Sequence, residues 1–222
     1  MLETFAQTYK SLFLILHLMS FAVGVGAATL MDITFGRYLL SLEGENWYPE
    51  LYKSAGRLIW LALIVIVLSG LGLFLADMSH LLASAKFLTK MIVVSVIILN
   101  GLVFNSVLIP RLGFIFGEAN SERLGVTSRH FRRSTFVSGA VSLTSWYGAV
   151  ILGGLNHVSL SFAVLIGVYG AALTLTVTGS LIAEELFSRR LKKKTSEAAQ
   201  GVASELLKDL ETYNTLFSVP RR

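Results

Sequence analysis

The stretch LIWLALIVIVLSGLGLFLA, residues 58–76, decides the class of this protein. Its 19 residues include no charged side chain, and the hydrocarbon core of a bilayer takes about 20 apolar residues of helix. Similar runs occur at four other places, and each must be helical because lipid offers no partner to an open backbone. The sequence therefore predicts five transmembrane helices, at residues 11–31, 58–76, 91–109, 135–154 and 158–183.

The composition of the whole chain agrees with a membrane protein. Of its 222 residues, 54% are hydrophobic and 15% are charged, against about 25% charged in soluble domains, and the mean hydropathy is +0.66. These values exclude an ordinary soluble enzyme and a disordered chain. The lack of cysteine excludes disulfides, thiolate metal sites and iron–sulfur clusters. We expect an all-α polytopic membrane helix bundle at residues 1–185, followed by a basic, amphipathic cytoplasmic tail at residues 186–222.

The positions of the basic residues predict how the bundle is oriented. Lys and Arg number 19 and Asp and Glu number 14, which gives a net charge of +5. Sixteen of the cations follow the first, third or fifth span, whereas the other side holds only Lys10, Lys86 and Lys90. Because cytoplasmic segments are enriched in Lys and Arg, we expect a bacterial inner-membrane protein with a periplasmic N-terminus and a cytoplasmic C-terminus. The same bias explains the basic segments, so we expect no nucleic-acid partner.

The predicted tail has the pattern of an amphipathic helix. Its apolar residues recur at alternating spacings of four and three, as in a heptad repeat: Ala199, Ala203, Leu206, Leu210, Tyr213 and Phe217. Such a helix lies along the membrane or docks on the bundle, or it joins two copies of the chain. Besides the lipid bilayer, the partner that we expect is a second copy, bound through this tail or through the Gly24 and Ala28 face of the first span.

His17 is the first candidate for a functional residue. Ser20, Gly24 and Ala28 recur at spacing four in the first span and form a small-residue face, the kind that packs against other helices in lipid. His17 lies on that same face, so it is expected to point into the bundle. An ionisable residue in that position is a functional candidate. The alternative is a neutral histidine that hydrogen-bonds to a hydroxyl group on a neighbouring helix.

Two further histidines and a methionine fall on the predicted outer side. His80 lies between the second and third spans, close to Met78, and His157 lies between the fourth and fifth. Imidazole and thioether groups together suit copper, and paired imidazoles suit haem iron. The sequence therefore suggests a copper or haem b site with His17 as the buried ligand and His80, His157 or Met78 as partners. The alternatives are solvated loop histidines and no cofactor.

Other polar residues within the spans allow a different function. Asp32 and Arg57 flank the ends of the first two spans, where we expect an ion pair, and Asn100 and Asn105 are expected to bond to other helices. The fourth and fifth spans are rich in Ser and Thr, which line a solute path or bond back to their own helix. No nucleotide-binding, zinc-protease or serine-hydrolase motif occurs, so we expect no enzyme activity.

Short motifs in residues 12–155 resemble the bacterial copper-resistance D family of inner-membrane proteins. They occur in the family's order: the small residues 24–28, Ser69-Gly70, Lys90 followed by Asn100, Pro110-Arg111-Leu112, and Arg132-Arg133-Ser134. The resemblance implies a relation to copper import or to membrane haem proteins.

The leading hypothesis is thus an inner-membrane protein that binds copper or haem for metal passage or electron transfer. The alternatives are a membrane scaffold or regulatory protein that associates through its tail, and a small-solute transporter.

Overall fold

The computed structural model describes residues 2–41, 49–108, 110, 129–155 and 160–217; the side chains of 35–41, 49, 191, 194, 195, 198, 211 and 214–217 are not part of this description. Every regular element in these segments is a helix. In chain order they are α1 (Leu2–Thr8), α2 (Lys10–Ser41), α3 (Pro49–Ala76), α4 (Met78–Leu82), α5 (Ala85–Val103), the π-helix η2 (Phe104–Leu108), α8 (Arg129–Gly154) and α9 (Phe162–Phe217).

Five of these helices are long and apolar enough to cross a membrane, which confirms the predicted fold class and number of spans. The candidate spans are Lys10–Thr34, Glu50–Ala76, Ala85–Leu108, Arg129–Gly154 and Phe162–Arg190. Several begin or end beyond the predicted apolar runs, because charged residues join the same helix. Glu50, Lys53 and Arg57, for example, occupy the first turns of α3. Hydropathy locates the apolar centre of a span, but backbone hydrogen bonding determines its ends.

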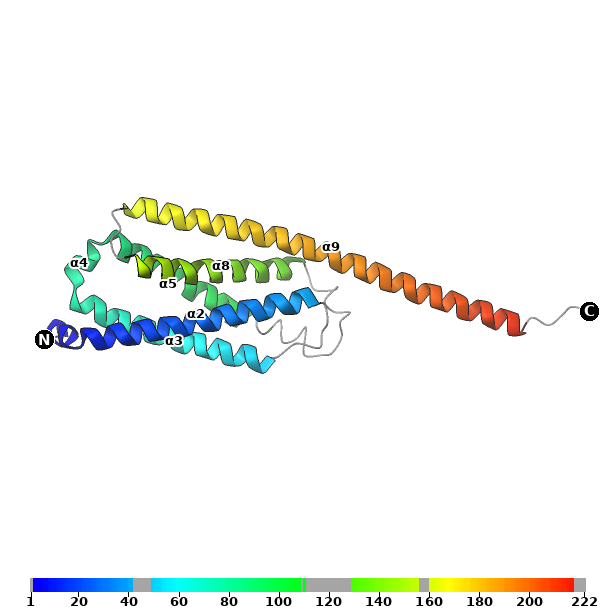
Figure 1. Cartoon of the computed structure of the whole chain (residues 1–222), viewed down its shortest axis with the longest axis horizontal. Helices are drawn as coiled ribbons and strands as arrows, with labels where there is room; N and C mark the ends of the chain where they lie inside the picture. The colour runs from blue at the N-terminus through cyan, green and yellow to red at the C-terminus, as the bar shows by residue number, and fades with distance from the viewer. Residues whose placement is uncertain (1, 42–48, 109, 111–128, 156–159, 218–222) are drawn as a thin grey trace, which may run out of the picture.

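The helices run roughly along one common direction (Figure 1). α2 packs along α3, while α5 and α9 both pack against α8. The larger of two buried apolar clusters among the described residues includes side chains from all five long helices. Its members include Ala28, Leu63, Val93, Trp146 and Leu165. Because lipid is as apolar as these side chains, close packing rather than water exclusion holds such a bundle together.

The small residues of α2 are used inside this bundle. A Cβ atom added at Gly24 would lie 2.7 Å from the Trp146 ring of α8, and one at Gly72 of α3 would lie 2.7 Å from the Phe13 ring of α2. Both glycines therefore allow an aromatic ring to rest directly on a backbone. Gly24 and Ala28 are buried within the chain, so their face packs against the protein's own helices.

A buried carboxylate joins α8 to α9 where α9 leaves the bundle. The Glu184 side chain is fully buried; Arg132 Nε and Arg133 Nε lie 3.3 Å from its two oxygens, and Ser188 Oγ donates to it over 2.6 Å. A carboxylate buried with two cations and a hydroxyl group is fully compensated. We call this end of the bundle the stalk end.

Beyond that point α9 continues without a break, so the predicted boundary between residues 185 and 186 falls inside one helix. Figure 1 shows its C-terminal part extending away from the other helices, at the opposite end of the molecule from α1. The segment 191–217, which we call the stalk, measures about 40 Å at 1.5 Å per residue. Helix α1 and the stalk therefore lie at opposite ends of the bundle, which is compatible with an odd number of spans.

Candidate functional site

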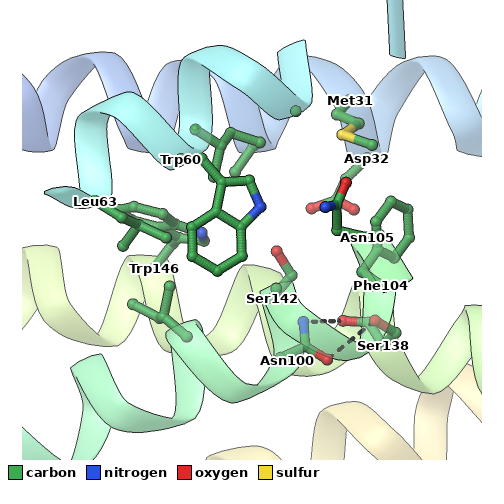
Figure 2. Close-up of a pocket in the computed structure, with 16 residues that line it drawn as sticks. Met31, Asp32, Trp60, Leu63, Asn100, Phe104, Asn105, Ser138, Ser142 and Trp146 are labelled. Atoms are coloured by element: carbon green, nitrogen blue, oxygen red, sulfur yellow. Dashed lines mark hydrogen bonds between the residues drawn. The ribbon is translucent and has the colours of Figure 1, made fainter. Parts of the chain in front are cut away.

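A cavity of about 60 Å³ lies between α2, α3, α5 and α8, and we call it the Asp32 pocket. This volume exceeds what one water molecule needs. Figure 2 shows the side chains around it. Sixteen residues line it: Ala28, Met31, Asp32, Gly56, Ile59, Trp60, Leu63, Ile97, Asn100, Gly101, Phe104, Asn105, Ser138, Gly139, Ser142 and Trp146.

Two local features of α5 shape one wall of the pocket. The helix widens into the π-helix η2 at Phe104–Leu108, and Phe104 and Asn105 from this wider turn line the cavity. Pro110, just beyond, has no N–H to donate to the carbonyl of Ser106, and its ring crowds that carbonyl, which favours a departure from α geometry. Single π turns inside helices often occur at functional sites.

The pocket has a polar side and an apolar side. Figure 2 shows Asp32, Asn105 and Phe104 on one side and Leu63 and Trp146 on the opposite side, with the Trp60 ring between them. Ser142 and the Asn100–Ser138 pair lie below the Trp60 ring in this view. An apolar cavity with a few convergent polar groups is the usual form of a small-molecule site.

Asp32 is the residue that distinguishes this pocket from ordinary packing. Its Oδ2 atom is buried, and within the described residues it has no hydrogen-bond partner. Ser142 of α8 interacts with the same carboxyl group, and Gly139 lies beside Oδ1.

The predicted ion pair between Asp32 and Arg57 is wrong: among the described residues no salt bridge joins the two. Asp32 faces α8 across the pocket, whereas the Arg57 side chain is exposed.

Asn100 anchors the floor of the pocket. Its Nδ2 donates to the Ser138 carbonyl over 3.1 Å, and Ser138 Oγ donates back to Asn100 Oδ1 over 3.0 Å. This agrees with the expected bond between helices. Because the two side chains satisfy each other, they fix α5 against α8 and leave Asp32, Asn105 and Ser142 to face the cavity.

His17 points into the bundle, as its position on α2 predicted, and it contacts α3. Its Nδ1 lies 3.1 Å from both the Ile66 carbonyl oxygen and Ser69 Oγ. A carbonyl only accepts, and Ser69 Oγ already donates to the Val65 carbonyl, so Nδ1 carries the proton. His17 is therefore a half-buried histidine whose Nδ1–H is held by a neighbouring helix, which fits the alternative that we considered.

The other predicted ligands do not gather around His17 in the described part of the chain. The His80 side chain is 80% exposed, with Nδ1 3.9 Å from Asp77 Oδ2, and Met78 is also exposed. His157 lies outside the described residues. Within the segments that the structure describes, no group of three His, Asp or Glu residues lies close enough together to hold a metal ion. Copper or haem binding therefore stays a prediction.

The hydroxyl groups of α8 and α9 mostly do not line a path. Ser134, Thr135, Thr174 and Thr178, for example, each donate to the carbonyl four residues earlier. Such bonds satisfy a hydroxyl group within its own helix. Among the described hydroxyl side chains of these two helices, Ser138 and Ser142 alone line the Asp32 pocket.

Sequence reasoning missed the pocket because it assigned Asp32 to an ion pair and Trp60 to an apolar run. The available signal was that five polar residues all fall in the halves of their spans nearest the predicted cytoplasmic side: Asp32, Asn100, Asn105, Ser138 and Ser142.

Comparison of the chain with protein-family models, with curated proteins and with solved structures finds no match in any of the three. The copper-resistance D resemblance thus rests on its short motifs alone.

Proposed function

We propose that this membrane protein binds a small polar solute in the Asp32 pocket and conducts it across the bilayer. The observation that supports the proposal is the unpartnered, buried Oδ2 of Asp32 in a cavity between four membrane-spanning helices. A polar atom without a partner costs about 1–3 kcal/mol when it is buried. Intramembrane ionisable residues that face a cavity typically mark substrate or ion pathways. A bound solute would supply the missing partner.

The experiment compares solute entry into proteoliposomes by stopped-flow light scattering. Guanidinium, urea and nitrate are suitable solutes, since they are planar, similar in size, and carry charges of plus one, zero and minus one. Valinomycin and potassium dissipate the membrane potential. The proposal predicts that one of the three enters faster than into protein-free vesicles.

A matched pair of glycine variants tests whether the solute passes through the pocket. Gly101 lines the pocket and an added Cβ would meet only the Trp60 ring, at 3.8 Å, so Gly101→Leu extends a side chain into the cavity. Gly167 of α9 is exposed and has open space beside it, so Gly167→Leu is the control. The first variant should abolish entry and the second should not. Entry at the protein-free rate for all three solutes, or full entry in Gly101→Leu, would contradict the proposal.

One observation keeps copper or haem binding as a second candidate. His17 donates Nδ1–H to a carbonyl group, and histidines that bind metals through Nε2 typically do the same. A complete site would need a partner such as Met78, His80 or His157. An absorbance scan and metal analysis of the purified protein test this proposal. A Soret band or bound copper that disappears in His17→Ala would support it, and neither signal in the wild type would remove it.

The stalk supports a proposal about the partner, namely a second copy of this chain. Val202, Leu206, Leu207, Leu210 and Tyr213 are each more than half exposed. Two copies anchored by identical spans would present their stalks in parallel and at the same height, which sets the register that a parallel coiled coil needs.

Cross-linking of the full chain tests this proposal. It should trap dimers in the wild type, and the substitutions Leu206→Glu and Leu210→Glu should remove them. Lys208→Glu is the exposed control. Dimers that persist after deletion of residues 196–222 would exclude the stalk.

A further inference from the structure

We propose that the solute of the Asp32 pocket is a small alkylammonium-type cation, with Asp32 as its counter-charge. This inference rests on the proposed function, because it assumes that the pocket binds a solute. It names the chemical class of that solute from the charge, the hydrogen-bonding groups and the shape of the pocket.

The charge of the lining favours a cation. Asp32 is the only ionisable side chain among the sixteen lining residues of the described pocket, which include no Lys, Arg or His. An anion would meet the carboxylate with no compensating cation. A neutral solute would leave the carboxylate charge uncompensated within the membrane, which is costly. A monocation removes both penalties.

The available hydrogen-bonding groups match a primary ammonium group. Asn100 and Ser138 bond to each other, so the remaining lining side chains with an oxygen atom are Asp32, Asn105 and Ser142. Each of the three carries an oxygen acceptor, and an ammonium group carries three N–H donors. The Trp60 ring lies between the polar and the apolar side of the cavity (Figure 2), and an indole ring also attracts a cation.

The apolar side of the pocket distinguishes an organic cation from a metal ion. Ala28, Leu63, Ile97 and Trp146 line this side and offer no side-chain oxygen. A metal ion such as Ca²⁺ takes six to eight oxygen ligands, more than three side chains supply. A short alkyl group, in contrast, fits against apolar walls. The pocket therefore matches a molecule with one ammonium end and one small apolar end.

The test is a binding titration with three probes of similar size, namely propylammonium, propan-1-ol and acetate. The full chain is placed in nanodiscs, and the intrinsic tryptophan fluorescence is recorded. The protein has three tryptophans, and Trp47→Phe leaves only Trp60 and Trp146, which both line the pocket. Propylammonium should bind at least tenfold more tightly than either of the other two probes. Asp32→Asn should weaken propylammonium binding at least tenfold, whereas Glu205→Gln, which removes an exposed carboxylate from the stalk, should not change it.

A second variant keeps the test valid if Asp32→Asn does not fold. Gly101→Leu fills the cavity and retains Asp32, so it should abolish propylammonium binding, whereas Gly167→Leu should not. Tighter binding of propan-1-ol or acetate, lost in Gly101→Leu, would overturn the cation assignment and leave the proposed function intact. A fluorescence change that depends on pH alone, and is the same with and without propylammonium, would identify the proton as the charge partner and also overturn the assignment. If propylammonium binds, but neither it nor any of the three planar solutes enters proteoliposomes faster than protein-free vesicles, the proposed conduction is wrong and the cation assignment stands.

Discussion

The two halves of α2 each hold an inward-facing ionisable residue of its candidate span, and these two residues, His17 and Asp32, are used in opposite ways. In the first half, His17 rests against α3 with Nδ1 bonded to the Ile66 carbonyl and to Ser69. In the second half, Asp32 faces a cavity with one oxygen unpartnered in the described structure. The two residues are separated by about 22 Å along the helix axis. The ionisable side chain of the first half is held by a neighbouring helix, whereas that of the second half borders a cavity.

This difference shows that an ionisable residue inside a membrane is not sufficient to mark a site. Both residues lie on the inner side of the same helix, and both are rare in lipid-embedded segments. What separates them is whether a neighbouring helix already satisfies them. His17 stabilises the contact between α2 and α3, whereas Asp32 retains an unsatisfied interaction for a ligand.

The largest expected effect compares a glycine-to-leucine substitution at a packed contact of α2 with the same substitution in the Asp32 pocket. Gly24→Leu would force a side chain against the Trp146 ring, which is 3% exposed and cannot move aside. Overpacking of this kind costs about 1–3 kcal/mol. Gly101→Leu enters the cavity instead and gains about 1 kcal/mol of helix propensity. Thermal unfolding in detergent should show a lower Tm for the first variant and an unchanged or higher Tm for the second. An equal loss of Tm in both variants would mean that the pocket is packed as tightly as the contact between Gly24 and Trp146.

The next comparison is between leucine substitutions of His17 and Asp32, which we expect to differ in their effect on the free energy of unfolding. His17→Leu removes the Nδ1–H group that the Ile66 carbonyl and Ser69 Oγ share, and it should destabilise the bundle by about 1–2 kcal/mol. Asp32→Leu removes an unpartnered oxygen but also the interaction with Ser142, so it should leave the free energy of unfolding unchanged or raise it by up to about 2 kcal/mol. Unfolding in a series of increasing denaturant measures both variants against the wild type. A loss of stability in Asp32→Leu as large as that in His17→Leu would show that Asp32 has a structural partner.

The smallest expected effect separates the two asparagines of the pocket. Asn100→Ala breaks both bonds to Ser138 and should cost about 0.6–2 kcal/mol. Asn105 has an exposed side chain, so Asn105→Ala should leave the free energy of unfolding within about 0.5 kcal/mol of the wild type. The same unfolding measurement distinguishes them. If the two variants lose equal stability, Asn105 also holds the fold and is less available to a ligand.

Much of the fold could be predicted because it follows from local composition. The five apolar runs, their helical state and the packed small-residue face around Gly24 depend on residues close in sequence, and the bilayer leaves few other solutions. The inward direction of His17 followed from helical periodicity alone. Its partners on α3 did not, because they are 49 and 52 residues away.

The site could not be predicted, since each of its parts has an ordinary explanation when taken alone. Asp32 lies at the end of an apolar run, where a charge is common, and Trp60 lies inside one. Arg57 is near in the expected topology, but its side chain is exposed while Asp32 faces α8. The rotation of each helix about its axis decides these contacts, and that rotation is set by packing between helices.

By itself, the sequence determined that this chain is a five-helix membrane bundle, and it predicts that most of the positive charge lies on one side. Lipid enforces that outcome, because it accepts only long apolar helices with satisfied backbones. Only the tertiary structure decided that His17 is bonded to α3, that Glu184 joins α8 to α9, and that Asp32 lies in a cavity. Those outcomes depend on how four or five helices pack together, because a small rotation of one helix turns a side chain away from its hydrogen-bond partner and toward a cavity.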